Sequence, residues 1–234
     1  YKQGDTVNIF VTFSEDMADS PTPQITITGS GISTTPINMS KIGSSAQNYS
    51  ADYTVPIGNT TFDCTMTFTA GTDLAGNTIA STPQQNSTFT IDNTQPQMSI
   101  TAKNPSNTTV TSGSSTSDAT LVLTFNTGET TSDFAQSDID LSGGTLSNFT
   151  PVSGPAISYT ATFTPTDDGN NKSCAISVDA GKYTDAAGNS NTSGSFSWTF
   201  LAPPFMTITA KDPRTSPHPT VTSGQITSAP MLFL

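Results

Sequence analysis

The sequence contains few of the residues on which nucleic-acid-binding and membrane proteins depend. Its 234 residues include only seven Lys and Arg against 18 Asp and Glu, which gives a formal net charge of -11. Scattered cations cannot form the clustered basic surface that binds phosphate groups. No apolar run is long enough to span a bilayer. We therefore expect no nucleic-acid partner and no membrane span.

Residues that carry catalysis are also scarce. The one histidine, His218, stands between Pro217 and Pro219. The sequence therefore lacks the histidines that a Ser-His-Asp arrangement or a histidine-rich metal site needs. Adjacent carboxylates such as Glu15 and Asp16 occur in turn-like segments, where solvated side chains are commoner than acid/base pairs. Glycine motifs that cradle phosphate are absent. We expect no enzymatic activity and no catalytic residue.

Low hydrophobicity and low charge occur together in this chain. Hydrophobic residues make up 32% and charged residues 11%. Disordered chains combine low hydrophobicity with high charge, whereas here Ser and Thr supply most of the polar residues, and Thr favours strands. The composition therefore predicts ordered β-structure, and the length predicts two domains of ordinary size.

Internal repeats about 110 residues apart organise the chain. The repeated pairs are "MSITAK" (98–103) with "MTITAK" (206–211), "TVTSG" (109–113) with the same letters at 220–224, and "CTMTFTAGTDLAGN" (64–77) with "CAISVDAGKYTDAAGN" (174–189). This spacing predicts three units. The first covers 1–92 and lacks its first strand, the second covers 93–201 and is complete, and 202–234 holds the first strands of a third.

Each unit is predicted to be all-β. Apolar residues alternate with Thr and Ser in several segments, which is typical of strands with one buried face. The alternating sets are Val7, Ile9, Val11 and Phe13; Phe62, Cys64, Met66 and Phe68; Tyr159, Ala161 and Phe163; Cys174, Ile176 and Val178; and Phe196, Trp198 and Phe200. No helix is expected, because no long stretch has helical periodicity and Gly or Pro interrupts nearly every segment. Several short strands per unit predict an antiparallel β-sandwich.

Five segments of the chain carry a family resemblance. They are "YKQGDTVNIFVTFSEDM" (1–17), "TDLAGN" (72–77), "TFTIDNTQP" (88–96), "YTATFTP" (159–165) and "TDAAGN" (184–189). The chain resembles the bacterial Ig-like tandem repeats of large surface adhesins and biofilm-associated proteins, and similar repeats occur in eukaryotic microbial surface proteins. The resemblance implies tandem Ig-like sandwiches, an extracellular or cell-surface location, and a spacer role.

The repeated D-x-x-G-N segment has two interpretations. Asp73 and Asp185 can accept hydrogen bonds from backbone N–H groups two or three residues later, while the Gly-Asn pairs at 76–77 and 188–189 tolerate positive φ. This favours a sharp turn. The alternative is a calcium site, with Asp92 of the interdomain linker as a further oxygen ligand, and the linker resembles the calcium-stiffened junctions of some adhesin repeats.

The two cysteines, Cys64 and Cys174, occupy the same position in consecutive repeats. A disulfide needs Cα atoms within about 7 Å, and equivalent points of two sandwiches placed end to end lie much farther apart. Buried free thiols are the favoured interpretation, and an interchain disulfide is the alternative.

N-x-S/T sequons predict glycosylation. They begin at Asn38, Asn48, Asn59, Asn86, Asn107, Asn148, Asn171 and Asn191, and three pairs recur between the repeats: Asn38 with Asn148, Asn59 with Asn171, and Asn86 with Asn191. Predicted loops and strand ends have room for a glycan. The other explanation is that Asn, Ser and Thr simply favour turns. The Ser-, Thr- and Pro-rich segment 212–224 is a candidate for O-linked sugar.

The missing and surplus strands suggest self-assembly. If the C-terminal segment of one chain completes the first unit of the next, the contact is heterologous and produces a filament. Met206, Ile208 and Ala210 would form the assembly strand. The alternative is that this sequence is one part of a longer chain of covalently joined repeats. The extra segment "APMLFL" (229–234) is consistent with strand donation only if two strands are donated.

Both explanations predict an extracellular structural protein, either a fibre subunit assembled head-to-tail from its own copies or a stalk segment of a surface adhesin. The alternative of a different class is a carbohydrate-binding or adhesive module, in which Tyr49, Tyr53 or Tyr183 stacks on sugar. Tyr49 and Tyr53 alternate with apolar neighbours, as core residues do. Binding of sugar would therefore depend mainly on Tyr183.

Overall fold

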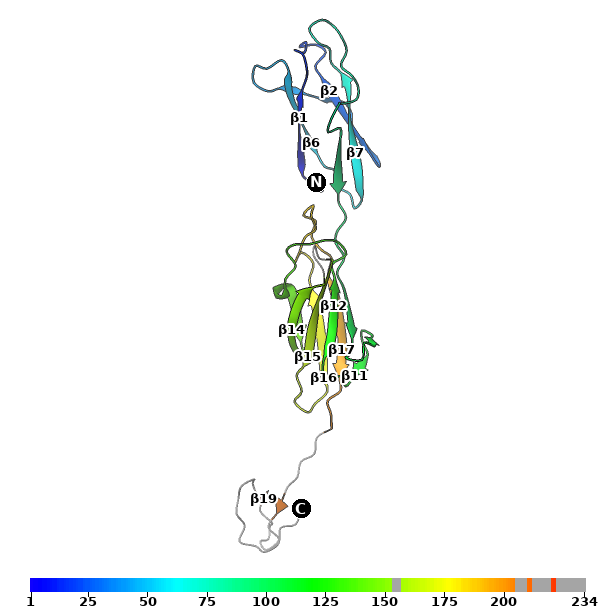
Figure 1. The fold of residues 1–234 in the computed structure, drawn as a ribbon, viewed down its shortest axis with the longest axis vertical. Helices are drawn as coiled ribbons and strands as arrows, with labels where there is room; N and C mark the ends of the chain where they lie inside the picture. Colours follow the sequence, from blue (N-terminus) through cyan, green and yellow to red (C-terminus); the bar gives the residue numbers. More distant parts are fainter. Residues whose placement is uncertain (153–156, 205–209, 212–219, 222–234) are drawn as a thin grey trace.

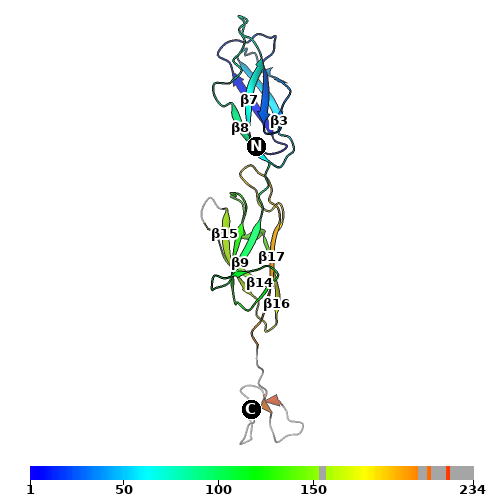
Figure 2. The same ribbon diagram turned by 90° about the vertical axis from the view of Figure 1, so that its right-hand side faces the viewer.

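The computed structural model describes residues 1–152, 157–204, 210–211 and 220–221. Two β-sandwiches follow one another along the long axis, and the short strand pair β18 (Ala210–Lys211) and β19 (Thr220–Val221) lies beyond the second (Figure 1). Turning the molecule by 90° shows the same end-to-end arrangement (Figure 2). The predicted fold class, all-β with tandem Ig-like antiparallel sandwiches, is confirmed.

The second domain has two sheets. One has the order β10 (Thr109–Val110), β9 (Ser99–Lys103), β12 (Leu121–Asn126), β15 (Ser158–Pro165) and β14 (Gly144–Pro151). The other has the order β11 (Ser115–Thr116), β17 (Gly194–Phe200), β16 (Lys172–Val178) and β13 (Ile139–Ser142). Among the described residues of this domain, all pairings are antiparallel except that of β11 with β17, and the one helical turn is the 3-10 helix η1 (Gln136–Asp138).

The first domain has a simpler arrangement. Its three-stranded sheet has the order β1 (Thr6–Thr12), β6 (Asn48–Thr54) and β5 (Ser40–Lys41). The facing sheet has the order β3 (Ile32–Ser33), β2 (Gln24–Gly29), β7 (Thr61–Ala70) and β8 (Thr88–Asp92), and β4 (Ile37–Asn38) pairs with β2.

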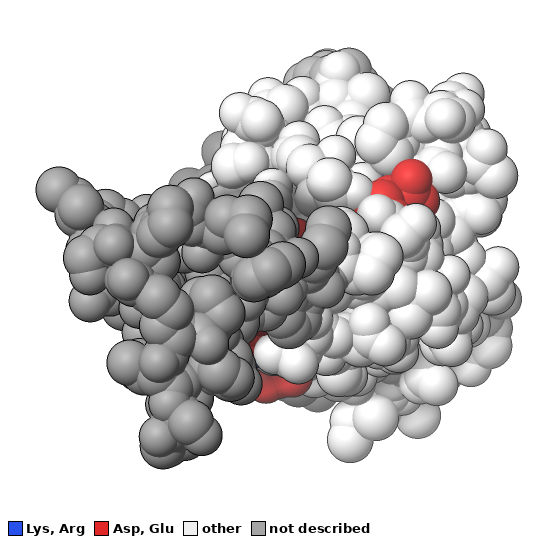
Figure 3. All heavy atoms as spheres, turned by 90° about the horizontal axis from the view of Figure 1, so that it is seen from below, with Lys and Arg blue, Asp and Glu red and all other residues white. Residues whose placement is uncertain are grey.

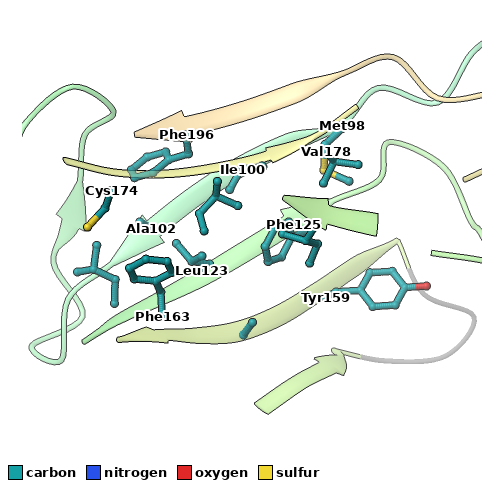
Figure 4. Packing of buried hydrophobic residues seen from close by; sticks show 14 of the residues in the cluster. Met98, Ile100, Ala102, Leu123, Phe125, Tyr159, Phe163, Cys174, Val178 and Phe196 are labelled. Carbon is teal, nitrogen blue, oxygen red and sulfur yellow. The ribbon is translucent and has the colours of Figure 1, made fainter. Parts of the chain in front are cut away.

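Period-two alternation creates both cores because successive side chains of a strand point to opposite faces. In the second domain, Ile100 and Ala102 of β9 point into the core beside Leu123 and Phe125 of β12 (Figure 4). Every alternating residue predicted in β15, β16 and β17 is buried. In the first domain several alternating residues are only partly buried; these are Val11, Phe13, Phe62, Met66 and Phe68.

Strand pairing aligns the two domains residue by residue. Cys64 lies opposite Phe89 in the first domain and Cys174 lies opposite Trp198 in the second. On the other sheet, Ile9 lies opposite Ala51 as Leu123 lies opposite Ala161. Thus β1, β6, β7 and β8 correspond to β12, β15, β16 and β17. Among the described residues, the first domain has no counterpart of β9, β10 or β11.

The surface is poor in positive charge. Viewed from the end that carries the C-terminus, the described atoms in sight include Asp and Glu side chains but no Lys or Arg (Figure 3). Within the described part of the chain, no helix is long and apolar enough to cross a membrane.

Candidate metal centre

The linker between the two sandwiches is fixed by hydrogen bonds to the second domain. β8 ends at Asp92 and β9 begins at Ser99. The Asn189 side-chain amide donates to the Asp92 carbonyl oxygen at 2.8 Å, and the Thr192 N–H donates to the Pro96 carbonyl oxygen at 2.9 Å. Since Pro96 is also buried, the linker packs against the second domain rather than crossing open solvent.

A glycine brings the loop after β12 against this linker. Gly128 has φ +80°, and a β-carbon there would lie 2.7 Å from the backbone nitrogen of Gln97. Only glycine combines this backbone conformation with so close an approach. The Tyr183 hydroxyl donates to the Thr127 carbonyl oxygen at 3.0 Å, and the Thr127 hydroxyl donates to the Glu129 carbonyl oxygen at 2.6 Å. These contacts place Glu129 at the junction.

The turn formed by the second D-x-x-G-N segment fixes the Asp185 carboxylate. One carboxylate oxygen of Asp185 accepts the N–H groups of Ala187 and Asn189 at 2.8 and 2.9 Å, and the other accepts the Asn189 side-chain amide at 2.8 Å. Gly188 has φ +87°. The predicted turn is confirmed, although the second N–H donor lies four residues after the aspartate and Asn189 does not adopt positive φ.

The equivalent turn of the first domain has the same chemistry. Asp73 accepts the N–H of Asn77 at 2.8 Å and its side-chain amide at 2.7 Å, and Gly76 has φ +90°. Hydrogen bonds from Asn77 hold the pKa of Asp73 below its ordinary value. Asp73 therefore shares the turn of Asp185 but belongs to no group of three ligand side chains among the described residues.

Three carboxylates converge at the junction. One oxygen each from Asp92, Glu129 and Asp185 lies within 4.8 Å of the other two. None of the ion pairs found in the described part of the chain involves them. Burial and the negative charges of Asp92 and Asp185 raise the pKa of Glu129. The cluster thus concentrates negative charge, and the nearby Lys2 side chain, whose Cε lies 3.3 Å from the β-carbon position of Gly188, forms no ion pair with it.

The geometry of this cluster fits calcium. Ca²⁺ binds oxygen ligands at about 2.3–2.6 Å, so two oxygens on one ion are at most about 5 Å apart, and the spacing within the cluster satisfies this limit. Asp92 is held in position because its carboxylate accepts the Thr61 hydroxyl at 2.5 Å and the Thr94 N–H at 3.1 Å. Carboxylates that are fixed before the ion arrives lose little entropy on binding it.

Glu129 is the residue of this site that the sequence did not reveal. It lies in no motif, and only the folded loop brings it to Asp92 and Asp185. A signal was present in the repeat. The N–H of Phe13 donates to the Gln47 carbonyl oxygen as that of Thr127 donates to Ile157, so Glu15 occupies the position of Glu129 in the first domain.

The sequons differ in accessibility. Asn38, Asn59, Asn86, Asn107, Asn148 and Asn171 are exposed, and Asn48 is half-buried. Asn191 is only 2% exposed, and its side chain bonds to the N–H groups of Lys182 and Tyr183 and to the carbonyl oxygens of Asp179 and Thr192. The prediction of a glycan at Asn191 is therefore wrong, because the folded domain uses all of its amide.

The three tyrosines considered for sugar stacking are buried. Tyr49 and Tyr53 lie in the first core, as the alternation indicated. Tyr183, the main candidate for stacking on sugar, is 1% exposed and packs against Phe134, with ring centroids 5.2 Å apart. None of these rings presents a face to a ligand.

Both cysteines are free, and each is 0% exposed. Burial raises the pKa of the Cys64 thiol and of the Cys174 thiol, which further reduces their reactivity. This agrees with the interpretation as buried thiols and leaves an interchain disulfide without access. Of the predicted assembly residues, Met206 and Ile208 lie outside the described residues, and Ala210 belongs to β18.

Comparison with protein families supports the architecture. Residues 92–201 match the family model described as "Bacterial Ig-like domain", a span that includes all three carboxylates of the junction. Such domains commonly occur in surface proteins, and their all-β fold is typical of non-enzymatic structural and adhesion modules. A search of curated proteins found no match to the chain.

Proposed function

We propose, because residues 92–201 match the model of the bacterial Ig-like domain family, that this chain is a load-bearing structural element of an extracellular surface protein. It serves as a stalk segment of a surface adhesin or as a subunit of a surface fibre assembled head-to-tail. The observation that carries the proposal is the junction, where hydrogen bonds and converging side chains hold one sandwich on the end of the next.

A stalk must resist bending, and bending is easiest where sandwiches are joined. Inter-domain motion is the default when a linker makes few contacts. Here the Thr192 N–H and the Asn189 side-chain amide donate hydrogen bonds to the linker, and the loop at Gly128 packs closely against it. The second domain therefore restrains the linker from two sides.

Calcium is the cofactor that we propose for the junction. Asp92, Glu129 and Asp185 would hold it, and the bound ion would offset most of their negative charge and join the linker to two loops of the second domain. The ion adds stiffness because each carboxylate comes from a different segment. Without it, repulsion among the three groups favours separation of these segments.

No catalytic role is part of the proposal, since the fold is typical of structural and adhesion modules. We propose that the seven accessible sequons are glycosylated in a host that attaches N-linked sugar. Intact mass tests this directly, because a mass equal to the 24.3 kDa of the sequence would exclude N-linked and O-linked sugar together.

Calcium binding and rigidity can be tested with a matched pair of variants. Asp185→Asn and Asp73→Asn each alter the carboxylate of the same turn, but only Asp185 belongs to the acidic cluster. In the parent chain and in Asp73→Asn, calcium should raise the melting temperature above the value in a chelator. It should also narrow the range of interdomain angles that fits the small-angle X-ray scattering.

Asp185→Asn should lose both calcium effects. If calcium changes neither the melting temperature nor the scattering of the parent chain, the proposed metal centre is wrong. If the parent chain bends freely under all conditions, the proposed rigid spacer is wrong.

A further inference from the structure

A pocket lies at the end of the first domain that faces the second (Figure 1). It is formed where β6 ends, β7 begins and the hairpin of β2 and β3 turns, and Asn93 of the linker completes its wall. Its volume of about 480 Å³ is in the range of small-molecule sites. All residues that line it lie between Ser30 and Asn93, so the first domain and its linker build it together.

The pocket exists because β5 is short. In the second domain a single residue separates β13 from β14, and Leu146 of β14 lies opposite Phe163 of β15. In the first domain β2, which pairs with β7 as β13 pairs with β16, turns back into β3. β5 then pairs with β6 only at Tyr49 and Ser50. In the described part of the chain, no strand therefore covers the edge of β6 beside Tyr53 on the side away from β1.

Two residues of the pocket differ from their counterparts in the second domain. Tyr53 corresponds to Phe163 by the pairing of β6 with β1 and of β15 with β12. Asn93 corresponds to Ala202 by the pairing of β7 with β8 and of β16 with β17. The second domain has no room at this place, because a β-carbon at Gly144 would lie 2.6 Å from the Phe163 ring. The first domain thus has space, a hydroxyl and an amide where the second is filled and apolar.

The hydroxyl and the amide oxygen are buried without protein partners. Tyr53 is 7% exposed and Asn93 is 4% exposed. Tyr53 Oη and Asn93 Oδ1 make no hydrogen bond among the described residues, and Asn93 Nδ2 donates only to the Pro56 carbonyl oxygen, at 3.4 Å. Buried polar atoms nearly always have a partner, because leaving them without one costs free energy. Both residues line the pocket, so a ligand bound there can supply the partners.

The rest of the lining is neutral and partly apolar. None of the described residues that line the pocket is charged. Ile32 and Phe62 are half-buried in its wall, and Ile57 is 92% exposed at its rim. Ser33 and Thr60 add exposed hydroxyl groups. A charged ligand would lose solvation here without gaining an ionic partner, whereas a neutral ligand with hydroxyl groups and an apolar face would find partners for both.

We propose that this pocket binds a neutral sugar unit through Tyr53 and Asn93. The Asn93 amide oxygen can only accept a hydrogen bond, and a tyrosine hydroxyl can donate one. Burial raises the pKa of Tyr53, so its hydroxyl keeps its proton at neutral pH. Sugar hydroxyls both donate and accept and therefore satisfy both atoms. The C–H face of the sugar ring would lie against Ile32 and Phe62.

This mode of binding uses the tyrosine hydroxyl and not the face of its ring. The Tyr53 ring lies in the core beside Phe89, with ring centroids 6.2 Å apart. The inference goes beyond the proposed structural role, since a spacer needs no ligand pocket. A stalk segment with this pocket would attach to sugar along its length as well as separate the parts that it joins.

Heteronuclear NMR of the full chain tests the site. The chain is produced without attached sugar, so that the exposed Asn59 beside the pocket carries no glycan into it. The probes are the methyl glycosides of glucose, galactose, mannose and N-acetylglucosamine, with glucuronic acid as the charged comparison. At least one neutral probe should shift the signals of Ile32, Ile57 and Phe62 in a saturable titration, and glucuronic acid should shift none of them.

Three variants identify the atoms that bind. Tyr53→Phe and Asn93→Ala each introduce the residue that the second domain has at the equivalent position, and each should weaken binding about three- to tenfold by removing one hydrogen bond. Tyr49→Phe is the matched control. It also removes a buried hydroxyl without a partner from β6, but Tyr49 does not line the pocket, so this variant should bind as the parent chain does.

Several outcomes would overturn the proposal. They are that no neutral probe shifts the pocket signals, that glucuronic acid binds as well as the neutral probes, or that Tyr53→Phe and Asn93→Ala keep the parent affinity. N-acetylasparagine amide is a further probe, and stronger binding of this compound than of every sugar would assign the pocket to a peptide side chain instead. None of these results affects the proposed stalk function, which is measured separately by the calcium response of the Asp185→Asn and Asp73→Asn pair.

Discussion

Gly128→Ala tests whether the second domain restrains the linker. The backbone of Gly128 has φ +80°, and a methyl group there would meet the nitrogen of Gln97 at 2.7 Å and its carbonyl oxygen at 2.9 Å. Real β-carbons do not approach backbone atoms so closely. Either the loop or the linker must move, and Glu129 moves with the loop.

The cost can be estimated from two contributions. An alanine at positive φ costs about 1–2 kcal/mol, and forcing an extra methyl group into a packed contact costs about 1–3 kcal/mol more. Gly113→Ala is the control, since Gly113 has φ +84° but nothing within 4 Å of its β-carbon position. The control should lose only the first contribution, and Gly128→Ala should lose both.

The assay is thermal unfolding by calorimetry, in calcium and in a chelator. For a domain of this size, 1 kcal/mol shifts the melting temperature by about 4–8 °C. Gly128→Ala should therefore melt clearly below Gly113→Ala and lose part of the calcium response, while Gly113→Ala keeps that response. If the two variants melt at the same temperature with the same calcium response, the linker is free to move away and the rigid junction is refuted.

Three further predictions concern single groups. Asn191→Ala should destabilise the second domain by at least about 2 kcal/mol in chemical denaturation, because it leaves buried backbone groups on both sides of the amide without partners; wild-type stability would mean that water replaces the amide. Burial opposes the charge of Asp133, but hydrogen bonds from Thr131 and Thr184 outweigh burial and lower the pKa of Asp133. The contribution of this carboxylate to folding stability is therefore fully present above its ordinary pKa of 3.8 and is lost as the pH falls through the lower folded value. Asp133→Asn should accordingly reduce stability at neutral pH and cause little change at the acid end, and a constant difference across that range would contradict the assignment. The two thiols should resist a thiol reagent in the native chain and react fully in denaturant, since both are buried; rapid native reaction would show that the cores open.

The strands were predictable because their signal is local. Alternation such as Val7, Ile9 and Val11 requires one face of a strand to be buried whatever the partner strands are. The turns at Asp73 and Asp185 were predictable for the same reason, because the donors and acceptors lie within four residues of each other.

The other properties of the junction depend on topology. Glu129 reaches Asp92 only because Gly128 bends the loop against the linker. Tyr183 was the main candidate for stacking on sugar, yet its hydroxyl donates to the Thr127 carbonyl oxygen inside the domain. Asn191 matched a glycosylation motif, but its side-chain amide is buried and bonds to the backbone of residues 179 and 182. In each case, a partner distant in the sequence decides the role.

The two repeats share two carboxylates at equivalent positions but differ in the linker residue that follows each of them. Each repeat carries a loop carboxylate and a turn carboxylate at the same end, Glu15 with Asp73 and Glu129 with Asp185. In the second repeat the third carboxylate comes from the linker that enters that end. Asp92 supplies it between the two described domains, and Leu201 stands at the same position after the second. In the proposed calcium centre, the linker residue at this position would therefore decide whether a junction can bind the ion.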